Sequence, residues 1–198
     1  MKVLVACEFT GTVRDAFIRA GHNAVSCDLL SSESDLGDHY QGDVRDILND
    51  GWDLMVAHPE CRYLTNAGVR WLHDDKNRWL DMIDGALFFK ELAAAPIERI
   101  AIENPIMHKY AVRIIEKKAD QYIQPWMHGE KQCKAIGLHL YNLPKLIPTK
   151  NVKVETMNLP YSERCKVHFA SPGENRSKDR SRFFRGVADA MANQWGAA

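Results

Sequence analysis

Short apolar runs alternate with helical patterns along most of the chain. Lys2 to Cys7 and Ala24 to Cys27 have the length and composition of strands, and positions 12–20 between them carry apolar residues at helical spacing. Leu54 to Ala57 and Ile100 to Ile102 are further apolar runs, each followed by polar residues and a proline. Strands that alternate with helices predict βαβ units, and therefore an α/β fold with a doubly wound, mostly parallel sheet.

The later patterns are less regular. The segment 68–95 has helical periodicity, with an expected apolar face made of Trp71, Trp79, Met82, Ile83, Ala86, Leu87 and Phe89. We expect Trp71 and Trp79 to belong to the core or to a lid rather than to stack on bases. The segment 143–181 is expected to be irregular and rich in loops, and a C-terminal helix is expected within 182–195. The whole of 1–198 is most simply one domain.

Charge and cysteine content narrow the class of protein. The 26 basic and 26 acidic residues balance, so contact with nucleic acid requires a local basic patch. Five widely spaced cysteines argue against a disulfide framework, and the eight histidines show no ligand spacing, so we expect no metal site. No apolar run approaches 18 residues, and the start of the chain is too short for a signal sequence, which predicts a cytoplasmic protein.

Chemically useful side chains follow several predicted strands. In a parallel sheet the carboxyl ends of the strands meet at one edge, where ligands bind. Cys61 follows a strand and a proline, so we interpret it as a nucleophile, the alternative being a buried structural thiol. Glu103 with Asn104 follows the next proline-terminated strand, and the alternative there is a solvated loop acid.

The ends of the first two strands suggest a cofactor site. Glu8, Phe9, Thr10 and Gly11 form a turn that leads into a helix, although a plain βα turn is an open alternative because Gly11 is its only glycine. The carboxylates of Asp28 and Asp43 are candidates to accept hydrogen bonds from a ribose, and each is equally a candidate helix cap or turn residue.

The order and spacing of these residues resemble the DNA cytosine-5 methyltransferases, and most closely the small phage and prophage proteins of that kind. The corresponding segments are Phe9-Thr10-Gly11, Asp28, Gly42-Asp43-Val44, Pro59-Glu60-Cys61, Glu103-Asn104-Pro105 and the basic stretch 129–134. The resemblance covers the chain to about Leu140. It implies a Rossmann-like fold of the class I S-adenosylmethionine-dependent type, and the cytoplasm of a bacterial host if the protein is phage-encoded.

The resemblance also implies a mechanism. The Cys61 thiolate would attack carbon 6 of a cytosine in DNA, after which carbon 5 accepts the methyl group of S-adenosylmethionine. Glu103 would stabilise charge on the ring, and Asn104 would orient its loop. Lys134 or Arg62 would lower the pKa of the thiol or hold a phosphate. The cofactor contacts would come from Glu8, Phe9, Thr10, Gly11, Asp28, Asp43 and Pro59.

The sequence departs from that family in two respects that bear on the substrate. Glu60 replaces a second proline before the cysteine and is expected to raise the thiol pKa unless it turns away. Only about sixty residues follow Lys134, which leaves no room for a long target recognition region. Arg62 and a basic cluster with Arg176, Arg180 and Arg182 are candidates to grip phosphates. The alternative substrates are single-stranded DNA and a free pyrimidine nucleotide. A further alternative is that the chain is a catalytically silent binding protein.

Overall fold

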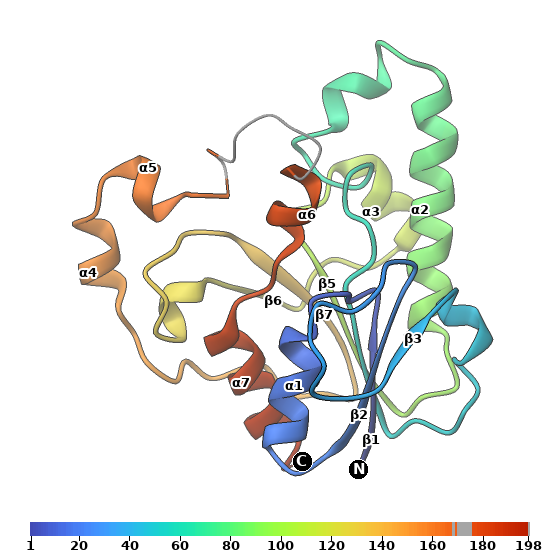
Figure 1. The fold of residues 1–198 in the computed structure, drawn as a ribbon. Coiled ribbons are helices and arrows are strands. Elements are labelled where there is room, and N and C mark those ends of the chain that lie inside the picture. The colour runs from blue at the N-terminus through green and yellow to red at the C-terminus, as the bar shows by residue number, and fades with distance from the viewer. Residues whose placement is uncertain (168, 170–175, 198) are drawn as a thin grey trace.

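Seven strands form one sheet at the centre of the molecule (Figure 1). The structure is a computed structural model, and it describes residues 1–167, 169 and 176–197. The strands are β1 (Lys2–Ala6), β2 (Asn23–Asp28), β3 (His39–Gln41), β4 (Leu54–Ala57), β5 (Arg99–Asn104), β6 (Gln121–Ile123) and β7 (Ile136–Tyr141).

The strand order is β3-β2-β1-β4-β5-β7-β6. All pairs from β3 to β5 are parallel, whereas β7 runs antiparallel to both of its neighbours. The expected α/β fold with a doubly wound, mostly parallel sheet is thus confirmed. In the sheet, β2 lies on one side of β1 and β4 lies on the other, so the strand order reverses at β1. The crevice beyond the carboxyl ends of these strands is therefore the expected ligand site.

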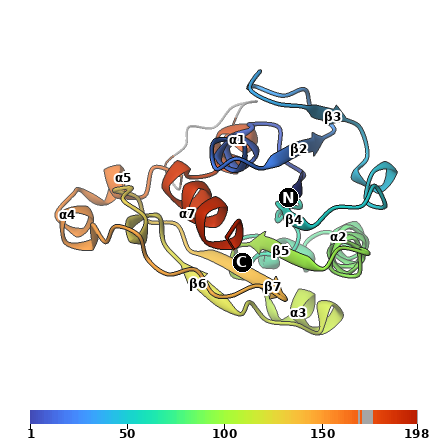
Figure 2. The same cartoon turned by 90° about the horizontal axis from the view of Figure 1, so that it is seen from below.

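Helices cover both faces of the sheet. They are α1 (Thr12–Arg19), α2 (Asn77–Ala93), α3 (Lys109–Ile115), α4 (Lys153–Met157), α5 (Tyr161–Arg164), α6 (Arg176–Ser181) and α7 (Arg185–Trp195), with short 3₁₀ turns η1 (Val44–Asp46), η2 (Val69–Leu72) and η3 (Pro125–Met127). Figure 2 shows α1 and α7 on one face and α2 and α3 on the other. Each face has its own apolar cluster because strand side chains alternate between the two faces. No helix in the described ranges has the length and apolar character needed to cross a membrane.

The segment 68–95 is not one continuous helix, and its expected apolar face is wrong in part. The short turn η2 comes first and α2 begins at Asn77. Met82, Ala86 and Phe89 are buried as expected, but Trp71, Ile83 and Leu87 are exposed. The buried face of α2 continues instead through Leu92, because Met82, Ala86, Phe89 and Leu92 recur every three or four residues on one side of the helix.

Candidate active site

Cys61 lies just beyond the carboxyl end of β4. The four residues of that strand are buried on both faces, and Pro59 ends the ladder because its nitrogen cannot donate a hydrogen bond. The half-buried thiol lines two adjoining cavities, a narrow one of about 400 Å³ and a wide one of about 870 Å³. The sulfur is therefore accessible to a small molecule, as a nucleophile must be.

Glu103 lies at the corresponding point of the neighbouring strand and lines the same wide cavity. Ala57 pairs with Ile102, so the next residue of each strand, His58 and Glu103, are neighbours at the sheet edge. The loops that follow the two strands are joined by backbone hydrogen bonds from Asn66 to Ile106 (3.1 Å) and from His108 to Leu64 (2.9 Å). This pairing fixes the position of the Cys61 loop relative to Glu103.

His58 is a member of this site that the sequence analysis considered only for metal binding. Its Nδ1 lies 3.7 Å from Oε2 of Glu103, and its ring packs at 4.7 Å against Phe183. His58 Nε2 and Glu103 Oε1 are both buried and have no hydrogen-bond partner among the described residues. The signal that could have identified His58 is its place immediately after a strand that pairs in register with the strand of Glu103.

The surroundings of Glu103 favour its ionised form. Burial alone opposes ionisation, since charge is costly away from water. The facing His58 ring and the nearby Lys134 ammonium outweigh burial and lower the pKa of Glu103 below its ordinary value. The free oxygen of a carboxylate is a strong acceptor for N–H groups, so this side chain is suited to hold an amine or a protonated ring nitrogen.

Burial keeps the thiol of Cys61 protonated at rest. Burial raises the pKa of Cys61 to about 11, and the carboxylate of Glu103 contributes in the same direction. Lys134 lowers that pKa, as expected from the sequence, while Glu60 raises it only as a minor effect. A ligand that neutralised the influence of Glu103 would therefore favour the thiolate.

Lys134 lines both cavities and Asn104 lines neither. Lys134 is held by a hydrogen bond from its backbone N–H to Oε1 of Gln124 (3.0 Å). Asn104 is fully buried, and the alternation of β5 points its side chain to the face opposite Glu103. Its side-chain amide has no hydrogen-bond partner among the described residues, so no contact with the loop supports the orienting role expected for it.

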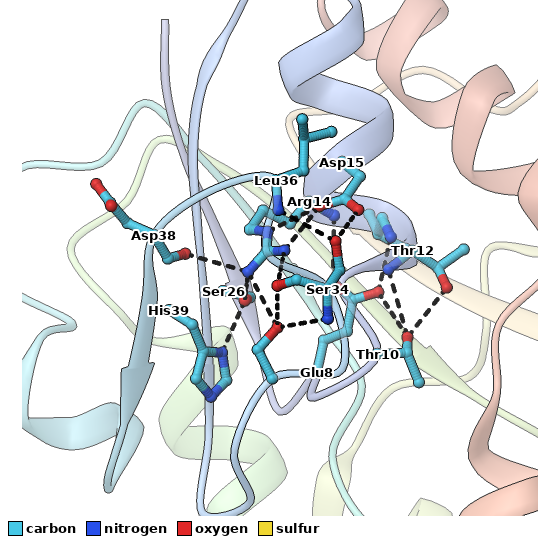
Figure 3. Close-up of polar contacts among 12 residues, drawn as sticks. Glu8, Thr10, Thr12, Arg14, Asp15, Ser26, Ser34, Leu36, Asp38 and His39 are labelled. Atoms are coloured by element: carbon cyan, nitrogen blue, oxygen red, sulfur yellow. Dashed lines mark hydrogen bonds and ion pairs between the residues drawn. The ribbon is translucent and has the colours of Figure 1, made fainter.

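The turn after β1 also lines the wide cavity. Glu8, Phe9 and Thr10 line it together with Pro59, so four of the expected cofactor residues share the cavity with Cys61, Glu103 and Lys134. The buried Glu8 carboxylate turns toward the start of α1, where its two oxygens accept from the backbone N–H groups of Val13 (2.7 Å) and Arg14 (3.1 Å) (Figure 3). Burial raises the pKa of Glu8 despite these hydrogen bonds.

Gly11 shapes this turn but does not line either cavity. Its backbone is left-handed, with φ at 72°, and a Cβ there would lie 2.8 Å from Nη2 of Arg14 and 2.8 Å from Cβ of Ser34. The buried Arg14 guanidinium reaches Oγ of Ser26 (3.0 Å) and the carbonyl of Ser34 (2.9 Å) (Figure 3). The single glycine of this turn, Gly11, therefore stands where the backbone packs closely against the Arg14 side chain.

Asp28 and Asp43 lie beside the cavity rather than in its lining. The Asp28 carboxylate accepts from the backbone of Leu30 (2.9 Å), and Asp43 caps η1 by accepting from the backbone of Arg45 (3.0 Å). Both charges, after burial, raise the pKa of the Cys7 thiol to about 12, and Cys7 does line the cavity. The first turn therefore has an acidic border.

The expected basic residues separate into two groups. Arg62 and Arg180 line the wide cavity and are exposed. Arg182 instead forms a bidentate ion pair with Glu33, in which Nη1 lies 2.6 Å from Oε2 and Nη2 lies 3.1 Å from Oε1. The side chain of Arg176 lies outside the described residues. Over the described part of the chain, no group of three histidine, cysteine or acidic side chains could hold a metal ion.

Comparison with known proteins gives no match to a protein-family model and none to a curated protein sequence. Among solved structures, a protein named as a DNA modification methyltransferase encoded within an E. coli prophage is 15% identical, with a TM-score of 0.48 over 81% of this chain and 56% of that chain. A methyltransferase of Entamoeba histolytica is 14% identical, with a TM-score of 0.48 over 89% and 62% of the two chains. The chain spans less than two thirds of the length of either protein.

Proposed function

We propose that this protein transfers a methyl group from S-adenosylmethionine to carbon 5 of cytosine in DNA through a covalent adduct with Cys61. The observation that carries the proposal is the joint lining of the wide cavity by Cys61, Glu103 and Lys134 and by the turn Glu8–Thr10. This arrangement matches in space the order of motifs that the sequence shares with cytosine-5 methyltransferases.

The expected cofactor residues of the cavity fit S-adenosylmethionine better than a dinucleotide. A pyrophosphate normally binds at a free helix N-terminus, but the start of α1 is already occupied by the Glu8 carboxylate. A sulfonium cofactor carries no phosphate and has a positive charge, which suits the acidic border of Asp28 and Asp43. When bound there, it would supply an electrophilic methyl group to the target base. Phe9 and Pro59 offer apolar surface to its adenosine.

The chemistry on the target base belongs to the side chains of the chain itself. Glu103 accepts a hydrogen bond from the exocyclic amine of the cytosine, and a second one from ring nitrogen 3 once that nitrogen carries a proton, which offsets the negative charge of Glu103 and favours the Cys61 thiolate. The sulfur then bonds to carbon 6, and the displaced electron pair makes carbon 5 nucleophilic. After methyl transfer, solvent water accepts the carbon 5 proton, the electrons of that carbon–hydrogen bond re-form the double bond between carbons 5 and 6, and the electrons of the sulfur–carbon bond leave with the sulfur, which restores the thiolate.

DNA is favoured over a free nucleotide by the cations around the site. Arg62 and Arg180 are exposed at the wide cavity, where they can contact phosphates on either side of a target base. A free pyrimidine nucleotide would use one phosphate contact at most. Tritiated methyl transfer to DNA and to dCMP, measured side by side, separates the two substrates.

An oligonucleotide that contains 5-fluorocytosine tests the mechanism directly, because the fluorine cannot leave as a proton does. With S-adenosylmethionine present, we expect mass spectrometry to show a stable adduct of protein, oligonucleotide and one methyl group attached at Cys61. Cys61→Ser should form none. Cys133→Ser, which changes a second thiol at the narrow cavity, is the matched control and should still form it. Absence of an adduct, with tight nucleotide binding by calorimetry, would indicate a silent binding protein instead.

A further inference from the structure

Three arginines outside the expected basic cluster surround the entrance of the wide cavity. Arg62 follows the nucleophile, Arg70 lies in η2, and Arg78 lies in the first turn of α2. All three line the cavity together with Trp71. In Figure 1 this green-cyan segment precedes α2, and α6, which carries Arg180, is drawn in red.

Each of these arginines lies against an aromatic ring. The Arg70 guanidinium is 4.4 Å from the ring centroid of Trp71, and the guanidinium groups of Arg78 and Arg62 lie 5.0 and 5.4 Å from that of Tyr63. Trp71 is 44% exposed even though it is a large apolar side chain. A planar cation beside an exposed ring such as Trp71 forms a surface on which nucleic acid bases also stack.

The charges of these arginines are not neutralised within the described part of the chain. Arg14, Arg19, Arg45 and Arg182 each form an ion pair with a carboxylate. Arg62, Arg70 and Arg78 form none with any described carboxylate, and the buried Nε of Arg78 lacks a hydrogen-bond partner there. Three cations that line one cavity and form no ion pair with a described carboxylate indicate that the partner supplies the negative charge.

We propose that Arg62, Arg70, Arg78 and Trp71 form a binding site for a single-stranded DNA segment, with the arginines on its phosphates and Trp71 stacked on a base beside the target. This proposal rests on the proposed function, since it places the neighbouring nucleotides relative to a cytosine held by Glu103. It extends that function by assigning the strand contact to η2 and the start of α2.

A single strand suits the position of the site better than a duplex. Glu103 is only 9% exposed, so a base reaches it only when it has left any stack. Extrusion from a duplex costs a few kcal/mol, whereas a single strand presents its bases without that cost. Trp71 also needs the face of an unpaired base, which a duplex hides inside its stack.

The test measures binding separately from methyl transfer. Fluorescence anisotropy with a fluorescein-labelled single-stranded oligonucleotide is recorded over a range of salt concentrations, using Cys61→Ser as the parent protein so that no covalent adduct forms. We expect Trp71→Ala to weaken binding about tenfold, within the range for loss of one base–aromatic stack, and Trp71→Phe to restore most of it. Arg70→Ala should reduce the slope of log K against log salt by about 0.7, the value for one lost phosphate contact.

The matched control is Lys153→Ala. Lys153 is also a basic residue beside a tryptophan, since its Nζ lies 5.3 Å from the ring centroid of Trp126, but it lines neither cavity. It should bind like the parent. Unchanged affinity and slope in Trp71→Ala and Arg70→Ala overturn the proposal, as does tighter binding to a duplex than to the single strand. If the variants weaken binding as expected but Cys61 forms no adduct with 5-fluorocytosine, the strand site stands and the proposed methyl transfer fails.

Discussion

His58 and Glu103 face each other at the ends of two adjacent parallel strands, with 3.7 Å between Nδ1 and Oε2. Both side chains are nearly buried, at 12% and 11% exposure, and both line the cavity that contains the Cys61 sulfur. Because Lys134 also acts on both Glu103 and Cys61, the four side chains form one electrostatic unit. Changing His58 or Lys134 should therefore alter the protonation of Glu103, and changing Glu103 or Lys134 should alter that of Cys61.

Replacing His58 should raise the pKa of Glu103. The facing ring offsets the cost of burying the carboxylate, so in His58→Gln burial dominates and the acid is held protonated to higher pH. A titration followed by NMR of ¹³C-labelled glutamate carboxyls measures this. If methyl transfer is confirmed, we expect its rate to fall about tenfold, which corresponds to about 1.4 kcal/mol. His73→Gln changes an exposed histidine outside both cavities and should leave the Glu103 titration in place.

Glu103→Gln should make the Cys61 thiol more reactive while it slows methyl transfer. The Glu103 charge raises the pKa of Cys61, so its removal increases the thiolate fraction at a given pH. Alkylation of Cys61 by iodoacetamide at pH 8, followed by peptide mass spectrometry, should be faster than in the wild type. The rate of methyl transfer should fall by about 100-fold or more, because the ring loses its charged partner. A slower alkylation would show that Glu103 does not act on the thiol.

Lys134→Met should have the opposite effect on the same thiol. The Lys134 ammonium lowers the pKa of Cys61, and without it the pKa should rise above about 11. The expected result is a slower alkylation of Cys61 at pH 8, measured in the same peptide assay. Equal rates in Lys134→Met and the wild type would contradict the assigned electrostatic role.

Glu8 should give the protein a stability that declines as pH rises. Burial raises the pKa of Glu8 in the folded chain, so its contribution relative to Glu8→Gln is fully present below about pH 4.5 and is lost as pH increases through the raised pKa. Urea unfolding at several pH values between 4 and 8 measures the difference between the two proteins. A difference that grows with pH would mean that the α1 N–H groups outweigh burial.

Glu33→Gln is the control for this experiment, because the opposite dependence of stability on pH is expected for Glu33. Hydrogen bonds from Arg182 and Lys178 lower the pKa of Glu33, so its contribution is present above the ordinary pKa of a glutamate and is lost as pH falls through the lowered value. The stability difference between wild type and Glu33→Gln should therefore grow with rising pH, and only weakly, because the ion pairs are exposed to solvent.

Gly11→Ala should destabilise the fold more than Gly21→Ala. Both glycines have positive φ, at 72° and 87°, so alanine is strained at either position by about 1 kcal/mol. A Cβ at Gly11 also meets Arg14 and Ser34 at 2.8 Å, whereas one at Gly21 meets nothing within 4 Å. Urea unfolding should show the larger loss for Gly11→Ala, and equal losses would mean that the Arg14 packing adjusts freely.

The sequence predicted well those features that depend on local pattern. Apolar runs of strand length such as Leu54–Ala57 are buried in the sheet as expected, because four adjacent apolar side chains need cover on both faces. The chemistry at the strand ends was also readable, since the prolines after Cys61's strand and after Asn104 mark where each ladder stops. In the segment 68–95 the local pattern gave a wrong prediction for Trp71, which was expected on the apolar face. It is exposed because the break before α2 changes which residues face the sheet.

The amino-acid sequence by itself determined the alternation of strands and helices and the presence of a thiol and a carboxyl at two strand ends, because these depend on neighbours along the chain. Only the tertiary structure decided that His58 faces Glu103, that Lys134 acts on both Glu103 and Cys61, and that Glu8 occupies the start of α1. Such relations depend on strand register and loop packing between residues distant in sequence. Burial and charge act through space, so a side chain's protonation and accessibility are fixed only when the chain has folded.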